Sequence, residues 1–214
     1  MTKYIFILLL FMSCTKQDIE PVFDIKETVL KEEPTPNRAF DNITYYANQH
    51  VSNHGYITYP MNQWSKTVVF TPSCRYECID PLNQDDWNKL FGVRKNAVEQ
   101  FKNGAYLVWC YVPYSIIQGD TIIDKIRIGW YLHNNAGNFV LMPLTETIYV
   151  DIGVPVSLYL RNFQTYFIYN LNGQAIYINK ADYNILNFSN GWRLSPNSGG
   201  QETQDHNMII SINN

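Results

Sequence analysis

The sequence is short of charge, of cysteine and of long apolar runs. Of its 214 residues only 16% are charged, and 16 basic and 19 acidic side chains give a formal net charge of -3. Phosphate attraction does not steer such a chain to nucleic acid, so we expect no nucleic-acid partner. A hydrophobic content of 46% excludes a disordered protein. A chain of this length can bury one sizeable core.

The sequence motifs of common enzymes are missing as well. We find no G-x-S-x-G, H-E-x-x-H or P-loop pattern. Glycosidases need two carboxyl groups facing each other across a sugar, and no strand carries acids at the alternate positions that would supply them. The four histidines are scattered, so we expect no metal site, and nothing indicates another cofactor. The sequence therefore predicts a protein that is not an enzyme.

The first apolar run is short and ends at a cysteine. Residues 4–12 are apolar, which is well below the roughly 20 residues that a membrane-spanning helix needs. A preceding lysine and the following Ser13-Cys14 predict an export signal over residues 1–13. Cys14 resembles the acylated cysteine of bacterial lipoproteins. That resemblance implies a lipid anchor in a membrane. The alternative is an ordinary signal peptide with an incidental cysteine.

Composition changes after the predicted signal. Residues 14–37 contain three prolines and many acidic side chains, which is typical of a tether rather than of a packed core. Residues 38–214 are expected to form a single domain. The predicted location is the outer membrane, facing the periplasm or the cell surface.

Strand patterns dominate the rest of the chain. Residues 106–112 form a continuous apolar run, as in a strand buried on both faces. Residues 126–133 alternate, with Ile126, Ile128, Trp130 and Leu132 on one face. Asn172-Gly173 lies between two apolar runs and predicts a hairpin. Only residues 85–91 look helical, with Asp85 as the cap and Gly92 as the end. The fold class is therefore all-β, an antiparallel β-sandwich or barrel with at most one short helix.

Two stretches resemble motifs of a known group of proteins. Residues 86–92 resemble a D-x-N-K-L-F-G signature. Residues 191–200, continuing to 206–209, resemble a glycine-rich ending that closes with histidine and aspartate. Together they are similar to a group of uncharacterised Bacteroidota lipoproteins. This resemblance implies a concanavalin-like, jelly-roll type β-sandwich but no activity. Asn207 replaces the usual aspartate beside His206.

Three cysteines follow Cys14. Cys74 and Cys78 would lie about 13 Å apart on one strand face, too far for a disulfide between them. The thiols are expected to be buried and inert, or Cys110 pairs with Cys74 or Cys78. A metal site is the least favoured interpretation.

The candidate ligand-binding residues are Trp64, Arg127, Tyr131 and His133. Trp64 stands among polar residues and is expected to be exposed, where it could stack on a sugar ring. Arg127, Tyr131 and His133 share one predicted strand face, as a lyase-like site would require, although a solvent-facing polar surface explains them as well.

The leading hypothesis is a membrane-tethered module that binds a glycan without catalysis. The alternatives are an accessory envelope lipoprotein that binds another protein and, less favoured, a polysaccharide-lyase-like enzyme. Asp120-Thr121-Ile122 also matches a short motif for O-glycosylation.

Overall fold

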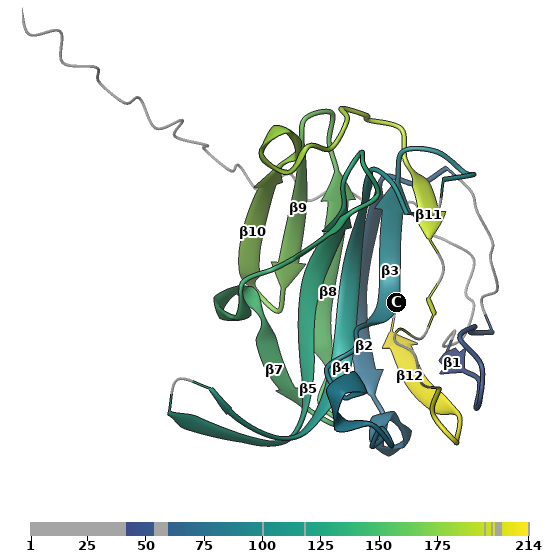
Figure 1. Ribbon diagram of the computed structural model, residues 1–214, viewed down its shortest axis with the longest axis vertical. Coiled ribbons are helices and arrows are strands. Elements are labelled where there is room, and N and C mark those ends of the chain that lie inside the picture. Colours follow the sequence, from purple (N-terminus) through teal and green to yellow (C-terminus); the bar gives the residue numbers. More distant parts are fainter. Residues whose placement is uncertain are drawn as a thin grey trace, which may run out of the picture. The chain divides into compact units, whose positions relative to one another are not determined.

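Two antiparallel β-sheets make up the fold (Figure 1). The computed structural model describes residues 42–53, 60–99, 101–117, 119–194, 196–197, 199 and 203–213. These residues all belong to one unit that spans residues 38–214. The predicted signal, Cys14 and the tether lie outside the described residues.

The first sheet has six strands. In spatial order they are β1 (Ile43–Tyr45), β12 (Met208–Asn213), β2 (Gln63–Phe70), β8 (Val156–Asn162), β9 (Tyr166–Leu171) and β10 (Gln174–Asn179). The last two strands form the predicted hairpin around Asn172-Gly173, where both residues have positive φ, as a tight two-residue turn requires.

The second sheet carries the candidate site. Its strands are β11 (Trp192–Leu194), β3 (Asn88–Arg94), β4 (Gly104–Ile117), β5 (Asp120–His133), β6 (Phe139–Leu141) and β7 (Ile148–Asp151). Strands β6 and β7 both pair with β5, β6 near its end and β7 near its middle. The chain between β6 and β7 therefore runs beside Gly129 and Trp130 at the sheet edge.

Helical structure in the described residues is confined to 3-10 turns. They are η1 (Pro72–Cys74), η2 (Pro81–Asn83), η3 (Leu144–Glu146) and η4 (Lys180–Tyr183). The helix predicted over residues 85–91 is wrong, because Asn88 to Phe91 belong to strand β3. No helix in the described part of the chain is long and apolar enough to cross a membrane.

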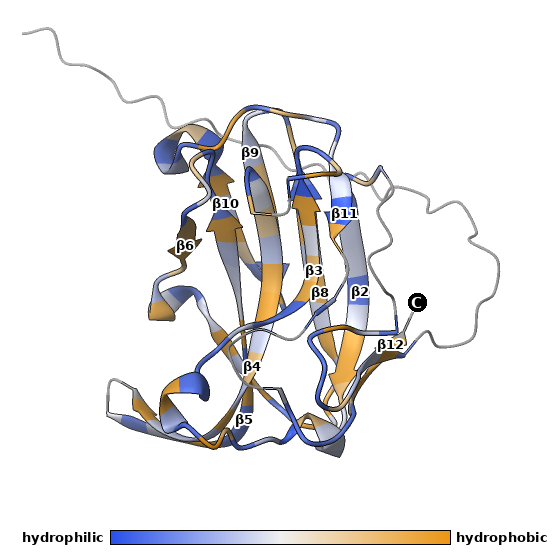
Figure 2. Ribbon diagram, turned by 45° about the vertical axis from the view of Figure 1, so that its right-hand side comes forward, coloured by the Kyte–Doolittle hydropathy of each residue, from blue (hydrophilic) through white to orange (hydrophobic). Residues whose placement is uncertain are grey.

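The core lies between the two sheets, and hydropathy alternates along the strands that enclose it (Figure 2). Trp130 of β5 stacks on Tyr169 of β9, with ring centroids 5.8 Å apart. Trp64 of β2 stacks on Phe91 of β3 at 5.2 Å. Ring contacts such as these join side chains of the two sheets, so the prediction of an all-β sandwich is confirmed.

Candidate functional site

Strand β5 divides its side chains between the core and a cleft. Ile126, Ile128, Trp130 and Leu132 are at most 1% exposed and belong to the core, as their alternation predicts. Because successive side chains of a strand point to opposite faces, the residues between them face away from the first sheet. The predicted sharing of one strand face by Arg127, Tyr131 and His133 is therefore confirmed.

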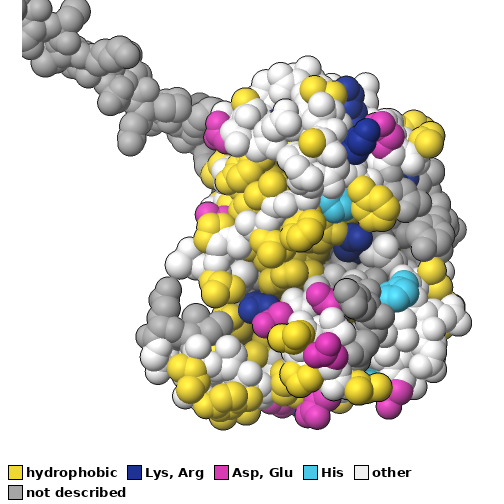
Figure 3. Space-filling view, viewed as in Figure 1, with side chains coloured by type: hydrophobic (Ala, Val, Ile, Leu, Met, Phe, Trp, Pro, Cys, Tyr) yellow, Lys and Arg dark blue, Asp and Glu magenta, His cyan; other side chains and the backbone are white. Residues whose placement is uncertain are grey.

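The cleft on this face has a volume of about 610 Å³. Figure 3 shows the face, with apolar side chains gathered in its middle and charged side chains around them. Twelve residues line the cleft, from β3, β5, β6 and the segments beside them: Asp85, Asp86, Trp87, Lys89, Arg127, Tyr131, His133, Phe139, Leu141, Met142, Leu144 and Gly199. The structure thus brings the three predicted β5 residues into one cleft.

Lys89 occupies an aromatic cage at one end of the cleft. Its Nζ lies 5.5 Å from the ring centroid of Tyr106 and 5.7 Å from those of Tyr131 and Phe101. Among the described residues, no carboxylate lies within ion-pair distance of this ammonium. Burial lowers the pKa of Lys89. This lysine is a half-buried cation that a ligand anion could pair with.

His133 belongs to the same cluster. Its ring lies 5.2 Å from Tyr131, 5.1 Å from Tyr106 and 5.4 Å from Phe101, measured between centroids. The Tyr106 hydroxyl approaches its Nδ1 at 3.4 Å. Burial raises the pKa of Tyr131 well above its ordinary value, so that phenol keeps its proton near neutral pH. The cluster therefore combines a cation, a phenol and an imidazole.

A β-bulge directs Lys89 into the cleft. Lys89 pairs with Val108, but Phe91 already pairs with Leu107, so one extra residue interrupts the register. Gly92 faces Tyr106 on the cleft side, because a Cβ added to it would touch that ring. In a regular strand Lys89, an odd number of residues away, would point to the opposite, core side. The bulge reverses that placement. Lys89 was not among the predicted site residues, because a helix was predicted here and the bulge that turns this side chain to the cleft leaves no signal in residues 88–94.

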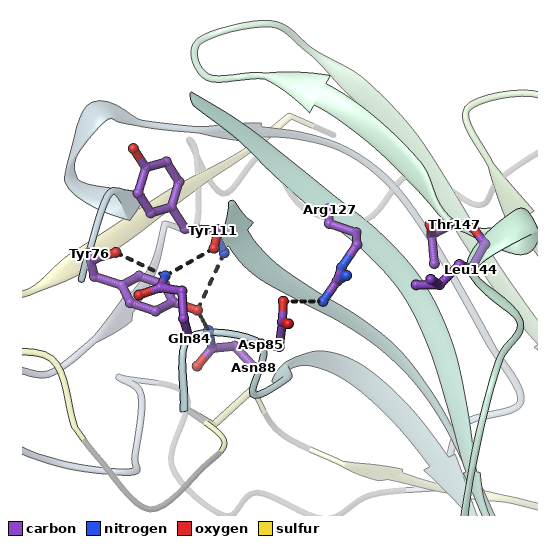
Figure 4. A network of polar contacts seen from close by, with 8 residues as sticks. All are labelled: Tyr76, Gln84, Asp85, Asn88, Tyr111, Arg127, Leu144 and Thr147. Carbon is purple, nitrogen blue, oxygen red and sulfur yellow. Dashed lines mark hydrogen bonds and ion pairs between the residues drawn. The ribbon is translucent and has the colours of Figure 1, made fainter. Parts of the chain in front are cut away.

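The opposite end of the cleft carries carboxylates. Arg127 donates from Nη2 to Asp85 at 2.8 Å (Figure 4). Its guanidinium lies 4.7 Å from the Trp87 ring centroid. Arg127 is 7% exposed, whereas the Asp85 side chain is 77% exposed. Asp86 also lines the cleft. Arg127 lies four residues from Tyr131 on β5, about 13 Å away. It is therefore not the cation beside Tyr131 and His133.

Hydrogen bonds to Tyr76 and to Tyr111 of β4 fix the loop that carries Asp85 and Asp86. Gln84 Nε2 donates to the carbonyl oxygens of Tyr76 and Tyr111, both at 3.1 Å. Asn88 Nδ2 donates to the Tyr76 hydroxyl at 3.1 Å, inside the protein (Figure 4). This network anchors both sides of the loop, so the two carboxylates are held at the cleft edge.

The middle of the cleft is apolar. Met142 covers Gly129, where an added Cβ would collide with the methionine sulfur and methyl group. The main-chain N–H of Trp130 donates to the Met142 sulfur at 3.0 Å. Leu141 and Leu144 beside it are 50% and 54% exposed. A ligand that spans the cleft therefore meets apolar side chains between its two polar ends.

Gly199 closes the cleft beside the carboxylate end. Its N–H donates to Asn88 Oδ1 at 3.1 Å, and an added Cβ would collide with the carbonyl oxygen of Trp87. Glycine is needed here for the close approach of the two backbone segments. Gly200 lies outside the described residues.

Trp64 does not belong to the cleft. It is 8% exposed and packs inside the sandwich on Phe91, so the prediction of an exposed tryptophan is wrong. Its polar neighbours Gln63 and Ser65 are exposed, which is the alternation of a strand whose tryptophan points inward. A direct contact between Trp64 and a sugar is therefore incompatible with its position.

The other predicted features have mixed outcomes. No disulfide joins Cys74, Cys78 or Cys110, and burial raises the pKa of Cys110 to about 11. His206, just before the last strand, contacts the Ser73 carbonyl oxygen through Nε2 at 2.9 Å. Thr121 is exposed near the tip of the β4–β5 hairpin, and its glycosylation stays a prediction.

No protein-family model matches the chain, and no curated protein matches its sequence. Solved structures resemble it at low identity. An alginate lyase from Alteromonas sp. 272 is 10% identical, with a TM-score of 0.43 over 73% of this chain and 69% of the lyase. The laminarinase catalytic domain of Thermotoga petrophila is 11% identical, with a TM-score of 0.44 over 82% and 75% of the two chains. A family 16 endo-glucanase from Bacteroides ovatus is 6% identical, with a TM-score of 0.43 over 84% and 81%.

These neighbours correct one prediction. The prediction that the protein is not an enzyme is contradicted, because solved structures that resemble the chain include a lyase and glucanases. That prediction rested on missing motifs. In a β-sandwich the groups that act together come from different strands, so their spacing along the sequence need not form a motif.

Proposed function

We propose that the protein binds an acidic polysaccharide in this cleft and cleaves it by β-elimination. The observation that carries the proposal is the ammonium of Lys89, which has no carboxylate partner among the described residues and lies beside Tyr131. A uronate carboxylate is an anion that such a partly desolvated cation attracts.

Elimination fits the side chains of the cleft better than hydrolysis does. A glycosidase needs two carboxyl groups about 5–9 Å apart on opposite sides of the sugar bond. The two carboxylates that line the cleft, Asp85 and Asp86, are adjacent in the chain, and Asp85 is paired with Arg127. Elimination needs instead a cation, a proton acceptor and a proton donor, and Lys89, His133 and Tyr131 can supply them.

Each side chain then has a definite role. Lys89 pairs with the uronate carboxylate, which makes the neighbouring C5 hydrogen more acidic. His133 accepts the C5 proton as the C4=C5 double bond forms. The C4–O4 bond breaks, and Tyr131, which burial keeps protonated, gives its proton to the departing oxygen. The elimination is redox-neutral: one C–H and one C–O bond break, a C=C and an O–H bond form, and no oxidant, reductant or water molecule is consumed.

The test uses the full chain in detergent with hyaluronan, alginate and polygalacturonate. The expected result is a new ultraviolet absorbance from unsaturated uronate, together with new reducing ends. Tyr131→Phe is expected to lower the rate about 100-fold or more, the usual contribution of proton transfer. Lys89→Met is expected to weaken binding, and the exposed Lys102→Met serves as its control. New reducing ends without ultraviolet absorbance indicate hydrolysis and refute the proposal.

We also propose that the protein is exported and anchored to a membrane through Cys14. Residue Cys14 follows a short apolar run, and the proline-rich stretch after it gives the anchored domain a spacer. Metabolic labelling with a fatty-acid analogue tests this. Label on the wild type and none on Cys14→Ser is the expected result, and equal label on both refutes it.

A further inference from the structure

The two polar ends of the cleft differ in charge. At one end Lys89 stands within an aromatic cage with no acidic partner among the described residues. At the other end Arg127 is already paired with Asp85, so the carboxylate of Asp86 adds a negative charge. An anionic sugar is therefore attracted to the first end and repelled from the second.

The second end suits a neutral sugar. Carboxylates accept hydrogen bonds from hydroxyl groups, and Asp85 and Asp86 are held at the cleft edge by the Gln84 and Asn88 hydrogen bonds. The indole of Trp87 lies beside them as a further contact for a sugar. Nothing at this end disfavours an uncharged ring.

The two ends are far enough apart to hold different units of one polymer. The backbones of Arg127 and Tyr131 mark the two ends and are four residues apart on β5, about 13 Å. The charged residues that would contact the sugars, Asp86 and Lys89, are only three residues apart in the chain, so neighbouring units of the polymer can reach both. Each end is therefore occupied by a separate sugar. If both sugars carried a carboxylate, one of these would lie against Asp86.

Apolar side chains lie between the ends. Met142 covers the sheet at Gly129, between the ends, and Leu144 beside it is half exposed. Leu141, also half exposed, pairs with Tyr131 and extends the apolar surface to the Lys89 end. A purely hydroxylated sugar gains little from these three side chains, whereas an acetyl methyl group buries apolar surface against them.

We infer that the polysaccharide alternates an acidic sugar with a neutral, N-acetylated sugar, in place of a carboxylate on every unit. The acidic unit lies at Lys89 and the neutral unit at Asp86, with the acetyl group against Leu144. This inference rests on the proposed function of the cleft, because it names the substrate class of the same site.

The experiment compares three probes on the full chain at physiological ionic strength: hyaluronan, which alternates uronate with N-acetylglucosamine, polygalacturonate, which carries a carboxylate on every unit, and neutral chitin oligosaccharides. Hyaluronan is expected to bind about tenfold more tightly than polygalacturonate, a factor equivalent to about 1.4 kcal/mol. Chitin oligosaccharides are expected to bind more weakly than hyaluronan.

Two variants test the assignment of the ends. Asp86→Asn removes the negative charge but keeps an amide oxygen as an acceptor, so it is expected to raise the affinity for polygalacturonate several-fold relative to the affinity for hyaluronan. Asp120→Asn, at the exposed start of β5, is the matched control. Leu144→Ala, at an exposed position, is expected to weaken hyaluronan binding while leaving polygalacturonate binding unchanged.

The outcomes separate the inference from the proposed function. Equal or tighter binding of polygalacturonate, with its cleavage, overturns the alternating substrate and leaves β-elimination in place. No binding or cleavage of any acidic probe overturns the proposed function itself. An Asp86→Asn variant that folds and keeps the wild-type preference overturns the role of Asp86.

Discussion

Replacing Lys180 by methionine tests how the fold holds the most buried charged side chain among the described residues. Lys180 is 0% exposed, and its Nζ donates to Asn162 Oδ1 at 2.7 Å. It also donates to the carbonyl oxygens of Phe163 at 2.6 Å and Phe188 at 2.7 Å. The same Nζ lies 3.8 Å from the ring centroid of Phe188. One ammonium thus joins the end of β8 to the chain that follows η4.

The size of the expected destabilisation follows from the hydrogen-bond acceptors that lose their donor in Lys180→Met. Methionine has a similar length but donates no hydrogen bond, so Asn162 Oδ1 and the two carbonyl oxygens lose the ammonium. Each buried acceptor left unsatisfied costs about 1–3 kcal/mol. We expect Lys180→Met to lower the free energy of unfolding by about 3–5 kcal/mol, the range for removing one partner from a buried charged network. Lys102→Met, at an exposed position, is expected to change it by less than about 0.5 kcal/mol.

The pH dependence gives this prediction its sharper form. Burial lowers the pKa of Lys180 from 10.5 to about 7. Between these two pH values the unfolded chain holds a proton that the folded chain has released, so wild-type stability rises with pH. The slope is at most about 1.4 kcal/mol per pH unit. The variant lacks this contribution, so its destabilisation is expected to be larger at about pH 10 than at about pH 7.

Urea unfolding followed by tryptophan fluorescence measures both quantities across this pH window. Lys102→Met controls for the loss of any lysine charge. A destabilisation by Lys180→Met that shrinks as the pH rises refutes the reasoning. In that case the hydrogen bonds to the ammonium outweigh its desolvation, and the folded state prefers the charged form.

Three further predictions concern stability and the cleft. Trp64→Ala is expected to lower the free energy of unfolding by about 3–5 kcal/mol in urea melts, because the indole packs inside the sandwich; a loss below about 1 kcal/mol contradicts its burial. Asp205 raises the pKa of His206 above 6.5, so the stabilisation is present below pH 6.5 and disappears as pH rises through the raised value. Urea melts of His206→Gln are expected to differ from wild type most at the acidic end, and a difference that does not change with pH contradicts this. Gly129→Ala is expected to cost about 1–3 kcal/mol and to weaken hyaluronan binding by displacing Met142 into the cleft; unchanged binding by calorimetry contradicts that displacement.

Much of the fold follows from strand periodicity. The alternation of residues 126–133 correctly assigns one side of β5 to the core and the other to the cleft, because side-chain direction in a strand depends only on position. The same rule applied to Gln63, Trp64 and Ser65 assigns Trp64 to the core. The prediction of an exposed Trp64 relied on its polar neighbours instead of on this alternation and was therefore wrong.

The site was harder to predict than the fold. Asp85 and Gly92 resemble the cap and the end of a helix, and a short sequence cannot distinguish these signals from a turn followed by a strand. Pairing with β4 selects the strand over the helix. Only an extended chain over residues 88–94 can form the backbone hydrogen bonds that cover the edge of β4. Such tertiary pairing is not visible in the local sequence.

The chemistry of the cleft depends on one irregular residue in β3. Without the bulge between Lys89 and Phe91, regular alternation from Gly92 would turn Lys89 toward the core. The cleft would then keep the carboxylates of Asp85 and Asp86 and lose the ammonium beside Tyr131. Bulges are known to redirect single side chains next to functional sites. Because of the extra residue, Phe91 packs on Trp64 in the core while Lys89, two positions earlier, faces the cleft beside Tyr131. A core side chain and a cleft side chain that would share one face of a regular strand therefore point to opposite faces.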